Sequence, residues 1–196
     1  MHPRPYLSHR QLILWEQSPD AYIQTYFYGK TIPINRGMAL GKQLADALEK
    51  DEETGDPIKD VVISQIHTYE LRDREILATL KHRDGSMQVL AKPDSCKKDF
   101  SAFLEYKTGL VPWTQNAVDE NSQLTFYATV LFLIAGKIPQ IRLDHIQTRR
   151  NGQVPEFTGE INSFYTSRTV GQIMKMMVRM RKAWREIDEE TNKRIV

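Results

Sequence analysis

Two carboxylates and an amine are spaced between residues 87 and 107 in a pattern that suits metal-dependent hydrolysis of a phosphodiester. A Pro-Asp pair ends at Asp94, and Glu105 and Lys107 follow with a single residue between them. Because successive side chains on a strand point to opposite faces, Glu105 and Lys107 share a face. We expect strands at 87–94 and 102–107 to pair as a hairpin and to place Asp94 across from Glu105 on that face.

The chemistry expected of these side chains follows from their types. Magnesium takes few protein carboxylates and keeps several waters, so Asp94 and Glu105 are expected to hold Mg²⁺, with Mn²⁺ as a substitute. The backbone carbonyl of Tyr106 could complete the shell. Lys107 is a compact cation that can orient or deprotonate the attacking water, or offset charge on the phosphate. Charged residues on a solvent-facing strand are the ordinary alternative.

A predicted helix adds two polar side chains to this set. In the stretch Q-L-T-F-Y, Gln123 and Tyr127 are four residues apart and therefore lie on one face of a helix. The glutamine can bond a phosphate or the site lysine, and the tyrosine can stack on a base or bond a phosphate. We assign both to the candidate catalytic set. An amphipathic helix with one polar edge is the alternative.

The composition fits one globular domain. The chain has 196 residues, of which 40% are hydrophobic and 27% charged, and its net charge is +2. There is no overall basic field, so a surface for nucleic acid would have to be local. A single cysteine excludes an internal disulfide and a four-cysteine metal site within the chain. No apolar run reaches the length of a membrane span and no secretion signal is recognisable, so we expect a cytoplasmic protein.

Periodicity and turn residues predict helices first, then a run of strands, then alternating helices and strands. Ser8 with Gln11 predicts a helix cap, Ser18-Pro19 begins a second helix, and Asp84-Gly85 predicts a hairpin turn. The predicted helices are 8–17, 19–28, 36–50, 119–135 and 167–190. The predicted strands or β-rich segments are 61–72, 74–82, 86–94, 102–107, 140–149 and 156–161, with a loop at 51–57. This order indicates a mixed α/β domain with a central sheet.

The motif P-D-x10-E-x-K followed by Q-L-x-F-Y resembles the PD-(D/E)XK nuclease superfamily, in particular its RecB-like and phage-type exonuclease branch. The opening L-S-x-x-Q-L from Leu7, followed by S-P-x-x-Y from Ser18, is similar to the helical segment that precedes the core in RecB-like proteins. The resemblance covers about residues 7–150.

The fold that this resemblance implies is a restriction-endonuclease-like α/β core, a central mixed β-sheet flanked by helices. We expect one nuclease-like domain over residues 1–196. Its parts would be an N-terminal helical extension at 1–35, the nuclease core at 36–165 and a C-terminal helix at 166–196.

Two departures from the family pattern concern its cofactors. RecB-like nucleases carry a metal-binding histidine four residues after a glycine in the first core helix, and counted from Gly37 that position is Gly41. Glu49 or Asp46 is the candidate third carboxylate, with a solvated helix residue as the alternative. CRISPR-associated relatives hold an iron–sulfur cluster with four cysteines. This chain has one cysteine, so no iron–sulfur cluster is expected.

The last predicted helix carries a basic stretch, because no acidic residue stands between Ser167 and Arg185. Such a face suits contacts to a phosphate backbone, and a solvated helix face is the alternative. The candidate DNA-binding residues are Arg168, Lys175, Arg179 and Lys182.

The resemblance implies a metal-dependent DNA nuclease, with exonuclease action favoured over endonuclease action, in phage or bacterial DNA processing, recombination or repair. Expected partners are DNA and recombination or replication proteins; a membrane is not expected. A phage-encoded protein would work in the bacterial host cytoplasm. Two other hypotheses stay open: a DNA-binding or scaffolding protein on the same fold that has lost cleavage, and a small α/β interaction protein with an acidic surface segment.

Overall fold

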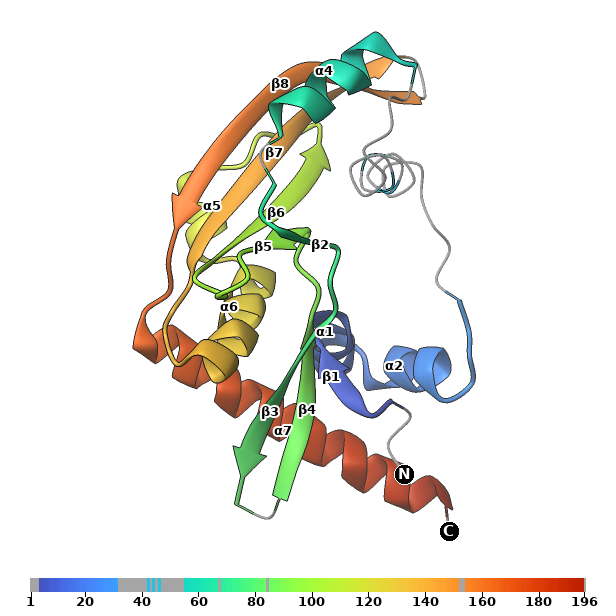
Figure 1. Cartoon of the computed structure of the whole chain (residues 1–196). Coiled ribbons are helices and arrows are strands. Elements are labelled where there is room, and N and C mark those ends of the chain that lie inside the picture. Colours follow the sequence, from blue (N-terminus) through green and yellow to red (C-terminus); the bar gives the residue numbers. More distant parts are fainter. Residues whose placement is uncertain are drawn as a thin grey trace.

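The chain forms two β-sheets with helices packed around them (Figure 1). The structure is a computed structural model that describes residues 4–31, 42, 44, 46, 55–66, 68–83, 85–151 and 154–195. One sheet joins β1 (Tyr6–Ser8), β4 (Gly85–Ala91) and β3 (Ile76–His82) in that order. The other joins β2 (Leu71–Arg72), β5 (Ser95–Cys96), β6 (Ala102–Gly109), β7 (Gln140–Asn151) and β8 (Val154–Thr166). The predicted fold class, α/β with mixed sheets flanked by helices, is confirmed.

The first two helices begin where their capping residues predict. Helix α1 (His9–Gln17) has a capping box, because the Gln11 backbone N–H donates to the Ser8 hydroxyl and the Ser8 N–H donates to the Gln11 side chain. Helix α2 (Pro19–Tyr26) is capped by Ser18 and has proline at its first position. These contacts satisfy backbone N–H groups that have no partner within the helix. Strand β1, which precedes α1, was not predicted.

The predicted pairing around Asp94 is wrong, although the β3–β4 hairpin is confirmed. Strand β4 pairs antiparallel with β3 and parallel with β1, and it does not pair with β6. Strand β6 pairs antiparallel with the short β5 and parallel with β7. Pro93 has no N–H to donate to a ladder, and β4 ends at Ala91. Asp94 therefore lies in the connection where the chain passes from one sheet to the other.

The β-rich segment predicted at 61–72 is wrong in its first part, which is helix α4 (Pro57–Gln65). Asp56 caps this helix, accepting hydrogen bonds from the N–H groups of Ile58 at 3.0 Å and Lys59 at 3.3 Å, and Pro57 follows it. The cap outweighs the strand preference of the β-branched residues, which pack against β8 instead. The predicted helix 36–50 lies mostly outside the described residues, of which 42, 44 and 46 are helical.

The helix predicted at 119–135 is α6 (Ser122–Ala135), which begins three residues later because Asn121 caps it by accepting from the Leu124 N–H. The short helix α5 (Gln115–Asp119) before it was not predicted. The last predicted helix is confirmed as α7 (Val170–Ile195). Its buried residues recur at helical spacing: Ile173, Met176, Met177, Met180, Ala183 and Ile187.

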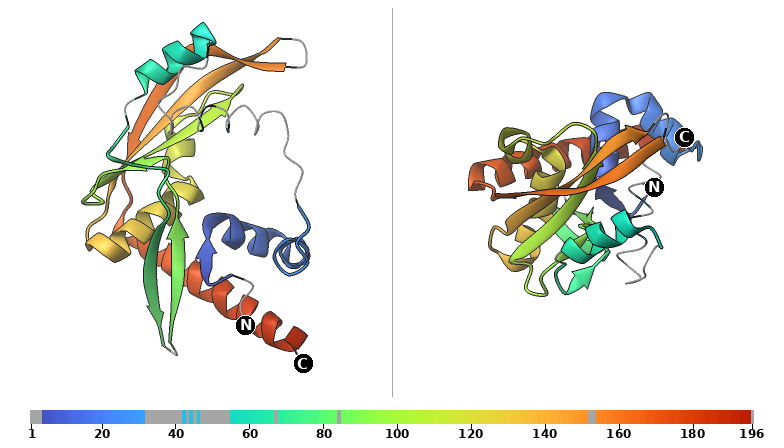
Figure 2. Two further views of the ribbon diagram at one scale, coloured as in Figure 1. Left: turned by 45° about the vertical axis from the view of Figure 1, so that its right-hand side comes forward. Right: turned by 90° about the horizontal axis from the view of Figure 1, so that it is seen from above.

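The main core lies where α6, α7 and α1 meet the two sheets. Helix α4 covers β8 at the other end of the molecule, over a smaller apolar cluster around Val62 and Phe157. In the left view of Figure 2, α1 lies beside β1 and α2, and α4 lies at the upper end of the molecule, away from them. Within the described ranges, no helix has both the length and the apolar character needed to cross a bilayer.

Candidate active site

Strand β6 presents the central pair of charged side chains. Glu105 and Lys107 share a face of this strand, as alternation requires, and the Lys107 Nζ lies 2.7 Å from the Glu105 Oε1. Glu105 is 4% exposed, whereas the side chain of Lys107 is 28% exposed. The carboxylate is thus buried inside the molecule while the ammonium group reaches towards solvent.

Helix α6 completes the network with the two residues predicted from their spacing. The side-chain amide of Gln123 bonds to both Glu105 and Lys107. Its Oε1 accepts a hydrogen bond from the Lys107 Nζ at 2.8 Å, and its Nε2 donates one to the Glu105 Oε1 at 2.8 Å. The same Nε2 lies 3.0 Å from the Tyr127 hydroxyl. Tyr127 is 9% exposed, and its ring lies edge-on to Phe103. In this arrangement Gln123 and Tyr127 hold Lys107 in place, and the tyrosine ring is too buried to stack on a base.

Asp94 joins the cluster from the connection between the two sheets. Its Oδ2 accepts a hydrogen bond from the Tyr106 backbone N–H at 2.6 Å, which fixes the carboxyl beside the strand that carries Glu105. Burial, and then the neighbouring Glu105 carboxylate, raise the pKa of Asp94 to about 8. Burial also raises the pKa of Glu105, against the opposing effect of Lys107. Without a cation, the two carboxyl groups retain a proton near neutral pH, and Asp94 carries it because Lys107 and Gln123 bond to Glu105.

The donor set fits a divalent metal ion. The Glu105 Oε2 is buried and has no hydrogen-bond partner among the described residues, although Oε1 has two. An ionised oxygen in this position is costly unless a cation binds it. Asp94, hydrogen-bonded to the backbone N–H of Tyr106, is close enough for the Glu105 carboxylate to raise its pKa, so the two carboxylates predicted to hold Mg²⁺ are brought together. The carbonyl of Tyr106 stays a prediction as a further ligand.

The third carboxylate is not supplied by the part of the chain that the structure describes. No group of three or more His, Cys, Asp and Glu side chains gathers there at a spacing that could hold a metal ion. Glu49 lies outside the described residues, and Asp46 is an exposed helical residue. A site with two protein carboxylates still suits magnesium, which keeps several of its waters.

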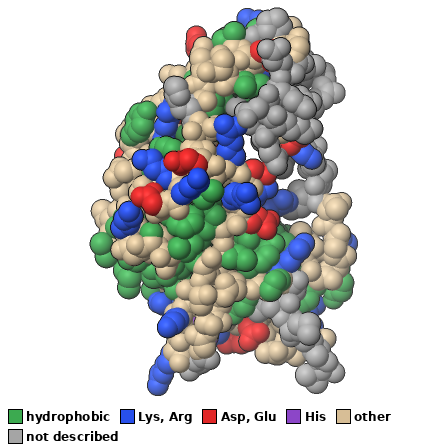
Figure 3. Space-filling model, in the orientation of Figure 1, with side chains coloured by type: hydrophobic (Ala, Val, Ile, Leu, Met, Phe, Trp, Pro, Cys, Tyr) green, Lys and Arg blue, Asp and Glu red, His purple; other side chains and the backbone are tan. Residues whose placement is uncertain are grey.

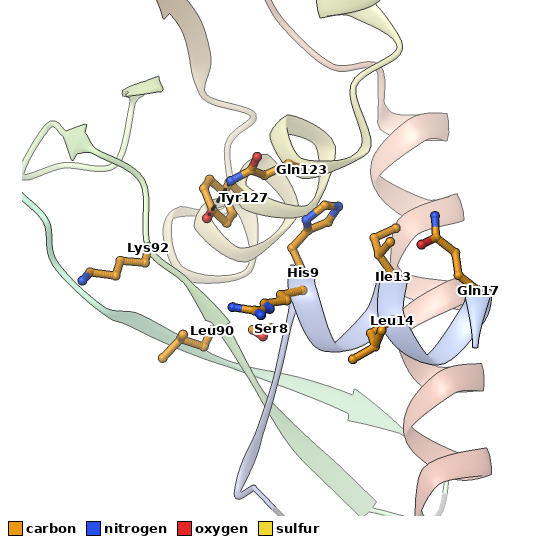
Figure 4. Close-up of a pocket in the computed structure, with 10 residues that line it drawn as sticks. Ser8, His9, Ile13, Leu14, Gln17, Leu90, Lys92, Gln123 and Tyr127 are labelled. Carbon is orange, nitrogen blue, oxygen red and sulfur yellow. Dashed lines mark hydrogen bonds between the residues drawn. The ribbon is translucent and has the colours of Figure 1, made fainter. Parts of the chain in front are cut away.

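A pocket of about 470 Å³ opens beside the network, between α1 and α6 (Figure 4). We call it the α1–α6 pocket. His9, Arg10 and Lys92 line it together with Gln123 and Tyr127, and sequence patterns gave no sign of the first three. The His9 Nε2 lies 3.0 Å from the Ser122 hydroxyl, and burial with the nearby Lys107 lowers the pKa of His9 to about 4. His9 is therefore a neutral imidazole at neutral pH. The packing of α1 against α6 brings His9 and Arg10 to the network, and Lys92 reaches it from the connection after β4.

Two of the four residues in the predicted basic set, Arg168 and Arg179, bond to other parts of the fold. Arg168 is buried, and its guanidinium donates to the Thr125 hydroxyl at 2.7 Å and the Val118 carbonyl at 2.9 Å. Its assignment as a DNA-binding residue is therefore wrong: it joins the start of α7 to α5 and α6. Arg179 forms an ion pair with Glu16.

Two lysines of the predicted set face solvent. Lys175 is exposed, and Lys182 is exposed with a long ion pair to Glu186 at 3.8 Å. Across the middle of the face in Figure 3, basic and acidic side chains are interspersed. The charge in this view is mixed, in keeping with a chain whose net charge is only +2.

Comparison with known proteins gives a fold and no family. No protein-family model matches the chain, and no curated protein matches it. Among solved structures, a "putative exonuclease" from Eubacterium rectale superposes with a TM-score of 0.62 at 11% identity, over 95% of this chain and 82% of that chain. An alkaline exonuclease from Laribacter hongkongensis superposes with a TM-score of 0.53 at 13% identity, over 96% and 91% respectively. The chain therefore has the fold of these two structures.

Proposed function

We propose that this protein is a magnesium-dependent deoxyribonuclease of the PD-(D/E)XK type that acts as an exonuclease. The observation that carries the proposal is the buried Glu105 Oε2, which lacks a partner within the described chain and lies beside Asp94 and Lys107. A buried carboxylate oxygen without a hydrogen bond is costly, and a cation bound to it would offset that cost. The fold shared with two structures named as exonucleases supports the same activity.

In this proposal, two residues bind the metal ion and three position the reacting groups. Asp94 and Glu105 would hold Mg²⁺, which when bound supplies an activated water and neutralises charge on the phosphate. The Lys107 ammonium donates to Glu105 and Gln123, and an ammonium has three donors. The third is left to orient the attacking water or to bond a phosphate oxygen. Gln123 fixes the direction of that donor, and Tyr127 fixes Gln123.

The wider role is proposed on the same basis. The substrate is DNA, and the exonuclease assignment follows the names of the two structural neighbours. DNA processing, recombination or repair in a bacterial cytoplasm, for a phage or its host, is the setting in which such an enzyme would act. Recombination or replication proteins are its proposed partners.

The test is a cleavage assay with end-labelled linear DNA and the same DNA closed into a circle. We expect linear DNA to be degraded with Mg²⁺ or Mn²⁺ and to survive with chelator, and circles to survive throughout. Glu105→Gln and Lys107→Met should abolish degradation, whereas Glu75→Gln, on an exposed acid before β3, should not. Cutting of circles would refute the exonuclease assignment. Folded protein that cuts neither DNA with any metal would favour a DNA-binding protein on the same fold.

A further inference from the structure

A second pocket lies next to the α1–α6 pocket, on the other side of the first turn of α1. We call it the N-terminal pocket; its volume is about 570 Å³, and it lies between β1, α1 and the end of α2. Ser8 and Arg10 line both pockets. The two hollows are thus adjacent, and Arg10 borders both the N-terminal pocket and the pocket that Gln123 and Tyr127 line.

Of the charged residues that the structure describes, those that line the N-terminal pocket are all cations. Arg4, Arg10 and Lys30 line it, and all three are exposed. No aspartate or glutamate of the described residues lines either pocket, although the chain contains 25 of them. In a protein whose net charge is only +2, this concentration of cations creates a local attraction for anions.

Two tyrosines stand among these cations. Tyr6 and Tyr26 line the pocket and are half-buried. Tyr26 packs against Tyr22 with ring centroids 4.8 Å apart, which fixes its orientation. Burial raises the pKa of Tyr26, while the adjacent Arg10 and Arg4 act in the opposite direction. Both guanidinium groups therefore lie close to the aromatic wall of the pocket.

Cations interleaved with aromatic rings recognise one kind of polyanion in particular. Single-stranded nucleic acid presents phosphates to Lys and Arg and unpaired bases to tyrosine rings. A duplex keeps its bases stacked inside, so it could offer only phosphates here. A hollow of about 570 Å³ has room for a small ligand or for part of a strand.

We propose that the N-terminal pocket binds single-stranded DNA through Arg4, Arg10, Lys30, Tyr6 and Tyr26, and that Arg10 passes the strand on to the catalytic cluster. The identity of the ligand as DNA rests on the proposed nuclease function. The substrate held during cleavage is then a strand separated from its complement next to the site. None of the five residues belongs to the set predicted from the sequence to bind DNA.

The test is DNA binding in chelator, where cleavage cannot contribute. Fluorescence anisotropy would measure the affinity of the full chain for a labelled 12-nucleotide single strand and for a blunt duplex of the same sequence, over a range of salt concentrations. We expect Arg10→Ala combined with Lys30→Ala to weaken single-strand binding at least tenfold. The slope of log affinity against log salt should fall by about 1.4, since each cation contributes about 0.7 with single strands. Duplex binding should change less than threefold.

Two further variants sharpen this test. Tyr26→Leu should weaken single-strand binding severalfold, whereas Tyr26→Phe, which keeps an aromatic face, should not. The matched control is Lys98→Ala, which removes an exposed lysine from the turn before β6. Single-strand affinity unchanged in the double variant, or equal losses for single strand and duplex, would overturn the proposal. Failure of the nuclease assignment would appear elsewhere, as folded protein that cuts no DNA with any metal, and would leave these binding curves unaffected.

Discussion

Glu105 and Arg168 are two charged residues that are buried to the same extent but differ in how completely they are hydrogen-bonded. Each is 4% exposed. The guanidinium of Arg168 donates to two hydroxyls and three backbone carbonyls, from Thr125, Thr166, Val118, Asn121 and Ser167. Glu105 has two bonds on one oxygen and, among the described residues, none on the other.

The contrast separates a structural charge from a candidate functional one. A buried charge with all its hydrogen-bonding groups satisfied holds elements of the fold together, and here Arg168 joins α7 to α5 and α6. A buried carboxylate with a free oxygen is destabilising in the absence of a ligand. Glu105 thus has an oxygen that can still bind a cation, whereas every N–H group of the Arg168 guanidinium is already hydrogen-bonded within the protein.

The largest effect is expected from Glu105→Gln. Activity (kcat/KM) should fall at least about a thousandfold, or ~4 kcal/mol in transition-state free energy, because the metal loses a charged ligand. Its melting temperature should stay the same or rise, since the variant removes a buried charge. Cleavage rates and thermal denaturation in chelator measure the two quantities. A large loss of stability together with activity would mean that Glu105 is structural, like Arg168.

The converse is expected of Arg168→Met. Losing a buried, fully bonded cation should lower the free energy of unfolding by about 3 kcal/mol. For a chain of this size that lowers the melting temperature by about 6–12 °C. Cleavage measured well below that temperature should remain within twofold of normal. Arg185→Met, an exposed arginine of α7, is the control and should change neither. Weakened DNA binding at unchanged stability would restore Arg168 as a DNA contact.

Asp94→Asn should sharpen the comparison through its pH dependence. The pKa of Asp94 is about 8 in the folded protein and near its ordinary value when unfolded, so between these values the unfolded chain binds fewer protons. The metal-free protein therefore loses stability as pH rises from about 4 to 8. Asn keeps the acceptor for the Tyr106 N–H and has no charge. The melting temperature of Asp94→Asn should therefore exceed that of the unmodified protein by a margin that grows from about pH 4 to pH 8, and cleavage should be lost. A margin that does not change with pH would contradict the argument that burial raises the pKa of Asp94.

The smallest effect is expected from Tyr127→Phe, because it removes only the hydroxyl that positions Gln123. Losing one partly buried hydrogen bond is worth about 1 kcal/mol, which corresponds to about a fivefold fall in kcat. The edge-on contact with Phe103 is retained, so KM and stability should be almost unchanged. Steady-state kinetics test this. A rise in KM alone would indicate that the hydroxyl contacts substrate rather than Gln123.

Residue types and their spacing are enough to predict the local features of this fold. Ser8 and Ser18 cap helices because their side chains bond N–H groups only three residues away. The shared face of Glu105 and Lys107 follows from strand alternation, and that of Gln123 and Tyr127 from the helical repeat. These relations act over short stretches, so sequence spacing alone is enough to predict them.

Which of these residues come into contact depends on the tertiary structure. Asp94 reaches Glu105 from the connection between two sheets rather than across the predicted hairpin, because β6 takes β7 as its parallel partner. Arg168 is enclosed by residues 43 to 50 positions away, which turns an apparent DNA contact into a packing element. Arg10 reaches the active site only because α1 packs on α6. Such contacts depend on how distant elements pack, and local residue patterns do not encode that.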